Sequence, residues 1–120
     1  MTSVLILGLD PSNIPAIDVD LVSEGLAYGL SRFDGTELVA DQCLVALEDS
    51  AVRATSDDLR AKRYAVVMIG GGIRKPEALL PFFDALVNLV HRTSPGSLVA
   101  FDSNGGDSLD AARRILATSG

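Results

Sequence analysis

The chain has 120 residues, of which 48% are hydrophobic, and a formal net charge of −6 with an isoelectric point near 4.5. This length and apolar content predict one compact domain spanning residues 1–120. The acidic balance argues against a nucleic-acid partner, because such partners are bound through clustered Lys and Arg.

Short apolar runs predict four β-strands. In chain order they are Val4–Leu7, Ala40–Leu47, Tyr64–Ile69 and Leu98–Phe101. The second run starts polar, which favours a position near the edge of a sheet, with its buried half at Cys43–Leu47. The third run carries no charge and is rich in β-formers, as expected for a strand covered on both faces.

Helices are predicted after each strand. The first runs from Asp18 to about Phe33, and a second of about two turns occupies Ser56–Arg63 with Ser56 as its cap. The third follows the glycines after Ile69 and continues to about Arg92. Pro81 requires that the regular part of this helix begins near Leu80, or that its first turn is kinked.

The last helix is predicted to start at Asp107. Asp107 and Asp110 have the spacing of a capping box, with Asp in place of Glu. Four strand-then-helix units in succession imply right-handed crossovers and a parallel sheet with helices on both faces. We therefore expect a three-layer α/β sandwich of the Rossmann or flavodoxin-like kind, with strand order 2-1-3-4.

In such sheets, ligands bind beyond the carboxyl ends of the strands, where the winding of the chain reverses. For this strand order, the crevice lies between the first and third strands. Loops from three strand ends meet there. They supply the candidate ligand-binding residues Asp10, Ser12, Asn13, Gly70, Gly71, Gly72, Arg74, Lys75, Asp102 and Asn104.

The three glycines permit positive φ angles and close backbone approach, so this loop can direct N–H groups at an anion. Arg74 and Lys75 place two cations beside it, and Arg can hold a carboxylate or phosphate through two hydrogen bonds. The alternative is purely structural: the glycines let the chain reverse tightly, and Arg74 pairs with Asp10 or Asp102.

Several specific motifs are absent. The dinucleotide fingerprint needs Gly-x-Gly-x-x-Gly after the first strand, where this chain has Gly8–Asn13, and no Gly-Lys pair exists for a P-loop. Two prolines in the loop after the first strand argue against the phosphate loop of FMN-binding flavodoxins. The sequence thus predicts no cofactor.

Single copies of Cys and His limit the available chemistry. Cys43 is the only cysteine, which excludes an internal disulfide and favours a reducing cytoplasm. His91 is the only histidine and is predicted at the rim opposite the crevice, so a Ser-His-Asp system lacks its base and a zinc site lacks ligands. With no signal peptide and no long apolar run, the sequence predicts a cytoplasmic protein with no metal and no membrane partner.

The run from Val67 to Arg74, together with residues 90–96 and Gly8–Pro11, resembles a family of small bacterial hypothetical proteins of about this length. The resemblance spans nearly the whole chain. It implies a Rossmann-like fold and a bacterial origin, but it carries no catalytic residue over to this chain.

Two functions follow as hypotheses. The first is a binding domain or a small enzyme that acts on an anionic metabolite, such as a sugar phosphate or nucleotide, held at Gly70–Lys75. The second is a non-catalytic homodimer that uses an apolar helix face. That face would consist of Leu80, Val87 and Leu89, unless these side chains pack against the sheet.

Overall fold

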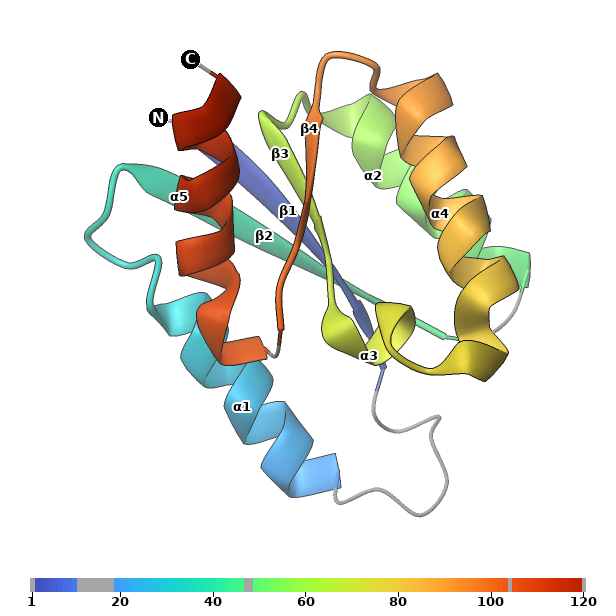
Figure 1. Ribbon diagram of the computed structural model, residues 1–120, viewed down its shortest axis with the longest axis horizontal. Helices are drawn as coiled ribbons and strands as arrows, with labels where there is room; N and C mark the ends of the chain where they lie inside the picture. The colour runs from blue at the N-terminus through green and yellow to red at the C-terminus, as the bar shows by residue number, and fades with distance from the viewer. Residues whose placement is uncertain (1, 11–18, 47–48, 104, 120) are drawn as a thin grey trace.

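The computed structural model describes residues 2–10, 19–46, 49–103 and 105–119. Its four strands are β1 (Thr2–Leu9), β2 (Leu38–Val45), β3 (Val66–Ile69) and β4 (Leu98–Phe101), all parallel, in the order β2-β1-β3-β4. Helices α1 (Val19–Ser31) and α5 (Ser108–Ser119) lie on one face of the sheet, and α2 (Asp49–Ala61) and α4 (Leu80–Thr93) on the other (Figure 1). The predicted α/β class and strand order 2-1-3-4 are therefore confirmed.

The alternation of side chains along the central strands divides the core into two layers. On β1, Val4 and Ile6 face α1 and α5, where they join Met68 of β3 in one buried cluster. Leu5 and Leu7 point to the other face and join a second cluster that contains Leu86 and Val90 of α4, among others. Both central strands are buried on two faces, which explains their nearly continuous apolar sequences.

Strand β2 lies at the edge of the sheet, as its polar start indicated. The expectation that its second half is buried was wrong: Leu38 and Val45 are buried at its two ends, while Cys43 is half-buried and Leu44 is 42% exposed. The reason is the edge position, because each side chain of β2 has a neighbouring strand on one side only and is less completely covered.

Helix α2 is longer than predicted. It begins at Asp49 rather than at Ser56, which lies within it. Thr55 is fully buried and stands four residues before the buried Leu59, so both share the inner face of the helix. The polar character of Thr55 concealed this periodicity in the sequence.

The chain between β3 and β4 contains two short helical pieces and one long helix. They are α3 (Gly71–Arg74), the 3₁₀ turn η2 (Glu77–Leu79) and α4, which begins at Leu80 with Pro81 in its first turn. Of the two alternatives raised by Pro81, a helix beginning near Leu80 is confirmed. Proline is tolerated there because the first amides of a helix have no intrahelical acceptor.

The last helix begins one residue later than predicted. A 3₁₀ turn, η3 (Gly105–Asp107), precedes α5. Asp107 directly precedes α5, in the position predicted for the cap. It accepts a hydrogen bond from the amide of Ser103, and Asp110 forms an ion pair with Arg32 at 2.7 Å, so the capping box stays a prediction. These bonds attach the start of α5 to the end of α1 and to the loop after β4.

Candidate ligand-binding site

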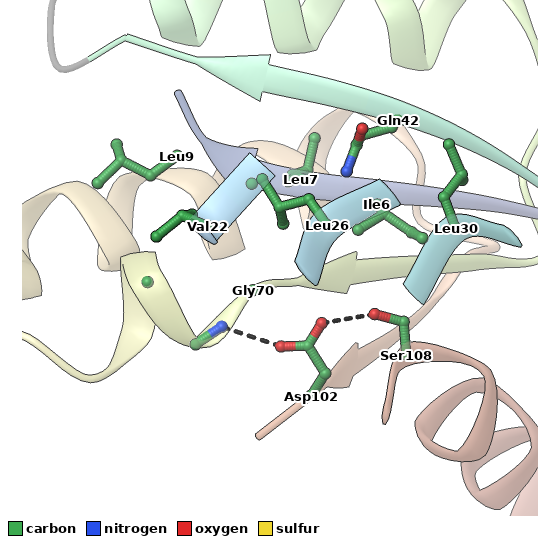
Figure 2. A pocket seen from close by; sticks show the side chains of 13 residues that line it. Ile6, Leu7, Leu9, Val22, Leu26, Leu30, Gln42, Gly70, Asp102 and Ser108 are labelled. Atoms are coloured by element: carbon green, nitrogen blue, oxygen red, sulfur yellow. Dashed lines mark hydrogen bonds between the residues drawn. The ribbon is translucent and has the colours of Figure 1, made fainter. Parts of the chain in front are cut away.

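A cavity of about 240 Å³ lies at the carboxyl ends of β1 and β3, between the sheet and α1. Its apolar lining comes from Ile6–Leu9 of β1 and from Val22, Leu26 and Leu30 of α1, and Gln42 of β2 adds an amide (Figure 2). The three α1 side chains are only partly buried, so the face that the helix presents to the cavity is not filled by the protein itself. The cavity thus occupies the crevice predicted from the strand order.

The main polar group of the cavity is the carboxylate of Asp102, just beyond the end of β4. Its residue is 2% exposed. One oxygen, Oδ1, accepts a hydrogen bond from the amide of Gly71 at 2.9 Å, and Oδ2 accepts one from the hydroxyl of Ser108 at 2.8 Å (Figure 2). Ser108 is itself buried and begins α5. Asp102 therefore connects the glycine-rich loop, β4 and the last helix.

Burial governs the acidity of this carboxyl. Desolvation raises the pKa of Asp102 above the ordinary aspartate value, and the hydrogen bonds from Ser108 and Gly71 offset part of that rise. A carboxylate has about four lone-pair positions, of which these donors occupy two. The remaining positions suit a hydrogen-bond donor or a cation on a ligand, and an anion placed against them would be repelled.

Arg74 and Lys75 contact the backbone of the loop after β4. Arg74 donates from Nη2 to the carbonyl oxygen of Asp102 at 2.9 Å, and the Lys75 ammonium donates to the carbonyl oxygen of Ser103. The Arg74 Nε atom is buried without a hydrogen-bond partner among the described residues. Both cations thus fasten one loop to another, and one N–H of Arg74 stays unused.

The glycines serve close approach and not positive φ. Gly70 has φ −69°, and among the described glycines only Gly35 has a positive φ, of 74°. A Cβ on Gly71 would lie 2.8 Å from the carbonyl oxygen of Ser103, and one on Gly70 would lie 3.2 Å from that of Leu7. Side chains at these two positions would push the loops apart, whereas Gly72 has space for one.

The structure brings together part of the predicted residue set. Gly70, Gly71, Gly72 and Asp102 line the cavity. Asp10 bonds through its amide to Val45 and is not among the lining residues, while Ser12, Asn13 and Asn104 lie outside the described residues.

Sequence reasoning missed two contributions to the site. Val22, Leu26 and Leu30 recur at helical spacing in the sequence, but this spacing does not show that they form the wall of a cavity. Ser108 gave no signal, because its bond to Asp102 depends on how the loop between β4 and α5 folds back. Helical periodicity locates an apolar face but does not reveal whether that face is filled.

Outside the crevice, His91 is exposed in the last turn of α4, as predicted. In the described part of the chain, no three His, Cys, Asp or Glu residues are grouped to hold a metal ion, and no helix is long and apolar enough to cross a membrane. Comparison with protein-family models, with curated proteins and with solved structures finds no match to this chain. The resemblance to small bacterial proteins therefore stays a prediction.

Proposed function

We propose that this chain is a binding domain for a small molecule, which places an apolar body between α1 and β1 and directs a hydrogen-bond donor at Asp102. The observation that carries this proposal is a buried carboxylate lining a mostly apolar cavity at the switch point of the sheet. A volume of about 240 Å³ suits a compact ligand. The partly buried α1 side chains gain further burial when the ligand enters, which favours binding.

The small anionic metabolite predicted from Gly70–Lys75 is the second candidate. The buried, unpaired Nε of Arg74 favours it, because this N–H would gain an acceptor. Against it, the Gly71 amide is already given to Asp102, so an anion taking that amide must displace a carboxylate. We therefore rank a donor-bearing ligand above an anionic one.

The homodimer stays a prediction, and the surface named for it changes. Leu89 is buried and Val87 packs against the core, so of the three expected side chains only Leu80, at 51% exposure, is available to a partner. Exposed apolar side chains also occur on α1, at Leu21 and Tyr28. Light scattering over a range of concentrations tests this alternative, and a monomer at high concentration would contradict it.

The binding proposal can be tested with three probes of equal chain length: hexylamine, hexanol and hexanoate. Titrations followed by amide and methyl NMR should show hexylamine and hexanol shifting the resonances of Gly71 and Leu26, with hexanoate binding more weakly. Replacing Asp102 with Asn should abolish the preference for the amine, because the charge that selects it is removed.

A matched pair of variants on α1 separates cavity binding from surface adsorption. Leu26→Trp fills the cavity and should remove binding, whereas Leu21→Trp changes a side chain that is 66% exposed and should leave binding intact. Equal affinities in these two variants, or no shift with any probe in the wild type, would refute the proposal. Tighter binding of hexanoate than of hexylamine would favour the anionic alternative.

A further inference from the structure

A second cavity, of about 740 Å³, lies at the opposite rim of the sheet, beyond the amino ends of β1, β3 and β4. One wall is the end of α2 and the segment that follows it, which contribute Arg60, Lys62 and Arg63. The other wall is the turn at residues 93–97 between α4 and β4. In Figure 1, the ends of α2 and α4 lie at this same edge of the sheet.

The charge of this cavity is opposite to that of the whole chain. The sequence contains 16 Asp and Glu against 10 Lys and Arg, yet the described residues that line the cavity include three cations and no acidic residue. A local basic surface on an acidic protein concentrates anions at that place, because like charges elsewhere repel them.

Two of the three cations are available to a ligand. Lys62 lies 3.0 Å from Asp41 and sits over the ring of Tyr64, so it is already engaged. Arg60 and Arg63 are exposed, and neither has a hydrogen-bond or ion-pair partner among the described residues. Two guanidinium groups three positions apart can each hold one phosphate group through paired hydrogen bonds.

The opposite wall is held rigid by its own hydrogen bonds. The hydroxyls of Ser94 and Ser97 lie 2.5 Å apart, Ser97 Oγ donates to the carbonyl oxygen of Tyr64 at 2.6 Å, and the Ser97 amide closes the turn on Ser94. This network fixes the turn against the start of β3. A ligand can therefore bind against this turn without first ordering it.

We propose that this cavity, which we call the amino-rim cleft, binds a small molecule that carries two phosphate groups, independently of the ligand in the crevice. The ends of α2 and α4 also account for cations at this rim, because helix carboxyl termini carry partial negative charge. If Arg60 and Arg63 serve only to stabilise these helix ends, replacing them should lower the stability of the protein and leave phosphate binding unchanged. The cleft predicts an effect on diphosphate affinity that is separate from stability.

The test uses sodium pyrophosphate, with orthophosphate and sulfate at equal ionic strength, and measures affinity by calorimetry and site by NMR. Pyrophosphate should bind more tightly than both single anions and shift the resonances of residues 93–97. Arg60→Ala and Arg63→Ala should each weaken pyrophosphate binding by about tenfold, the usual value of one lost charge-assisted contact. Arg53→Ala, an exposed change on α2 outside the cleft, is the control and should change affinity less than twofold.

Three outcomes would overturn the proposal: no pyrophosphate binding by the wild type, equal losses in all three arginine variants, or resonance shifts at Gly71 instead of the cleft. Equal losses would mean that only general electrostatic attraction is at work. Because Leu26→Trp blocks the crevice and leaves the cleft open, the failure of one site can be told from the failure of the other.

Discussion

At the scale of single residues, the unexpected feature is that Asp102 occupies the place predicted for a ligand's negative charge. The glycine-rich loop does direct an amide at a carboxylate, and the carboxylate belongs to the protein. Glycine is needed where two loops approach closely, and a buried amide needs an acceptor. A glycine-rich loop with an amide directed at a carboxylate therefore arises without any bound anion. The sequence could place Asp102 at the correct rim, but not its hydrogen bonds, because these depend on the approach of two loops from strands that pair only in the folded state.

Asp102 should make stability depend on pH in a defined direction. Its pKa is raised in the folded state above the ordinary unfolded value of about 3.9. Between these two values the folded protein binds more protons, so the free energy of unfolding should fall as pH rises through the interval and stay constant above it. Asp102→Asn should remove this fall, because the amide keeps an acceptor for Gly71 and a partner for Ser108 without a buried charge.

Urea unfolding of the wild type and Asp102→Asn across acidic and neutral pH measures this difference. At neutral pH the Asn variant should be at least as stable as the wild type, and Asp102→Ala should lose about 1–3 kcal/mol, because Gly71 keeps a buried amide without an acceptor. Glu37, Asp41 and Asp110 have lowered pKa values and act in the opposite direction, so the result is read from the difference between the two curves. Parallel curves would show that Asp102 does not titrate in this way.

Gly71 and Gly72 are adjacent and should respond differently to alanine. A Cβ at position 71 meets a backbone carbonyl at 2.8 Å, and one at position 72 meets only Leu9 at 3.9 Å. Gly71→Ala should cost about 1–3 kcal/mol of stability through forced loop displacement. Gly72→Ala should be neutral or should stabilise by up to about 1 kcal/mol, since alanine restricts the unfolded chain. Thermal unfolding of both variants tests the pair, and equal destabilisation would contradict the close approach at Gly71.

At the scale of elements, α1 is attached to the last helix at its carboxyl end. Arg32, just after α1, donates to the carbonyl oxygen of Gly106 at 2.8 Å and to the carboxylate of Asp110 at 2.7 Å. The cavity lies between α1 and the sheet. This attachment therefore fixes the width of the cavity without filling it.

Arg32→Ala should loosen α1 selectively. Amide hydrogen exchange of α1 should speed up more than that of α4, because the lost bonds join α1 to the start of α5 and do not involve α4. Arg113→Ala is the matched control on α5: it removes one ion pair with Glu37, in which both side chains are more exposed. Its effect should be smaller, in keeping with about 0.2–1 kcal/mol for exposed pairs. Equal protection of α1 in both variants would contradict the anchoring role of Arg32.

Strands were easier to predict than helix boundaries. The predicted bounds of the fourth strand, Leu98–Phe101, were correct to the residue, and the central part of each other strand was found. Short uncharged apolar runs are typical of strands that are covered on both faces, so they are easy to recognise. Helix α2 was predicted too short because Thr55, a buried polar residue, interrupts the apolar stripe in the sequence. The end of one helix and the start of the next depend on contacts with distant loops, which local patterns do not contain.

At the scale of the whole molecule, the strand order could be predicted because few arrangements satisfy right-handed crossovers with short connections. The order in turn placed the crevice between β1 and β3, where the cavity lies. The amino-rim cleft was not predicted. Its two walls are separated by about thirty residues in the sequence, and its basic character is hidden in a chain that is acidic overall.

Strand β2 is eight residues long and, within the described part of the chain, has no strand on its outer side. Val39 and Leu44 of β2 are more than a third exposed. The unpaired edge of this strand could therefore pair with a strand of a second molecule, as edge strands do in fibrils. Asp41 stands midway along this edge, held by Lys62 and Tyr64. Copies stacking in register would bring identical carboxylates together at every layer, so Asp41 disfavours that arrangement wherever the stacked strands separate it from Lys62.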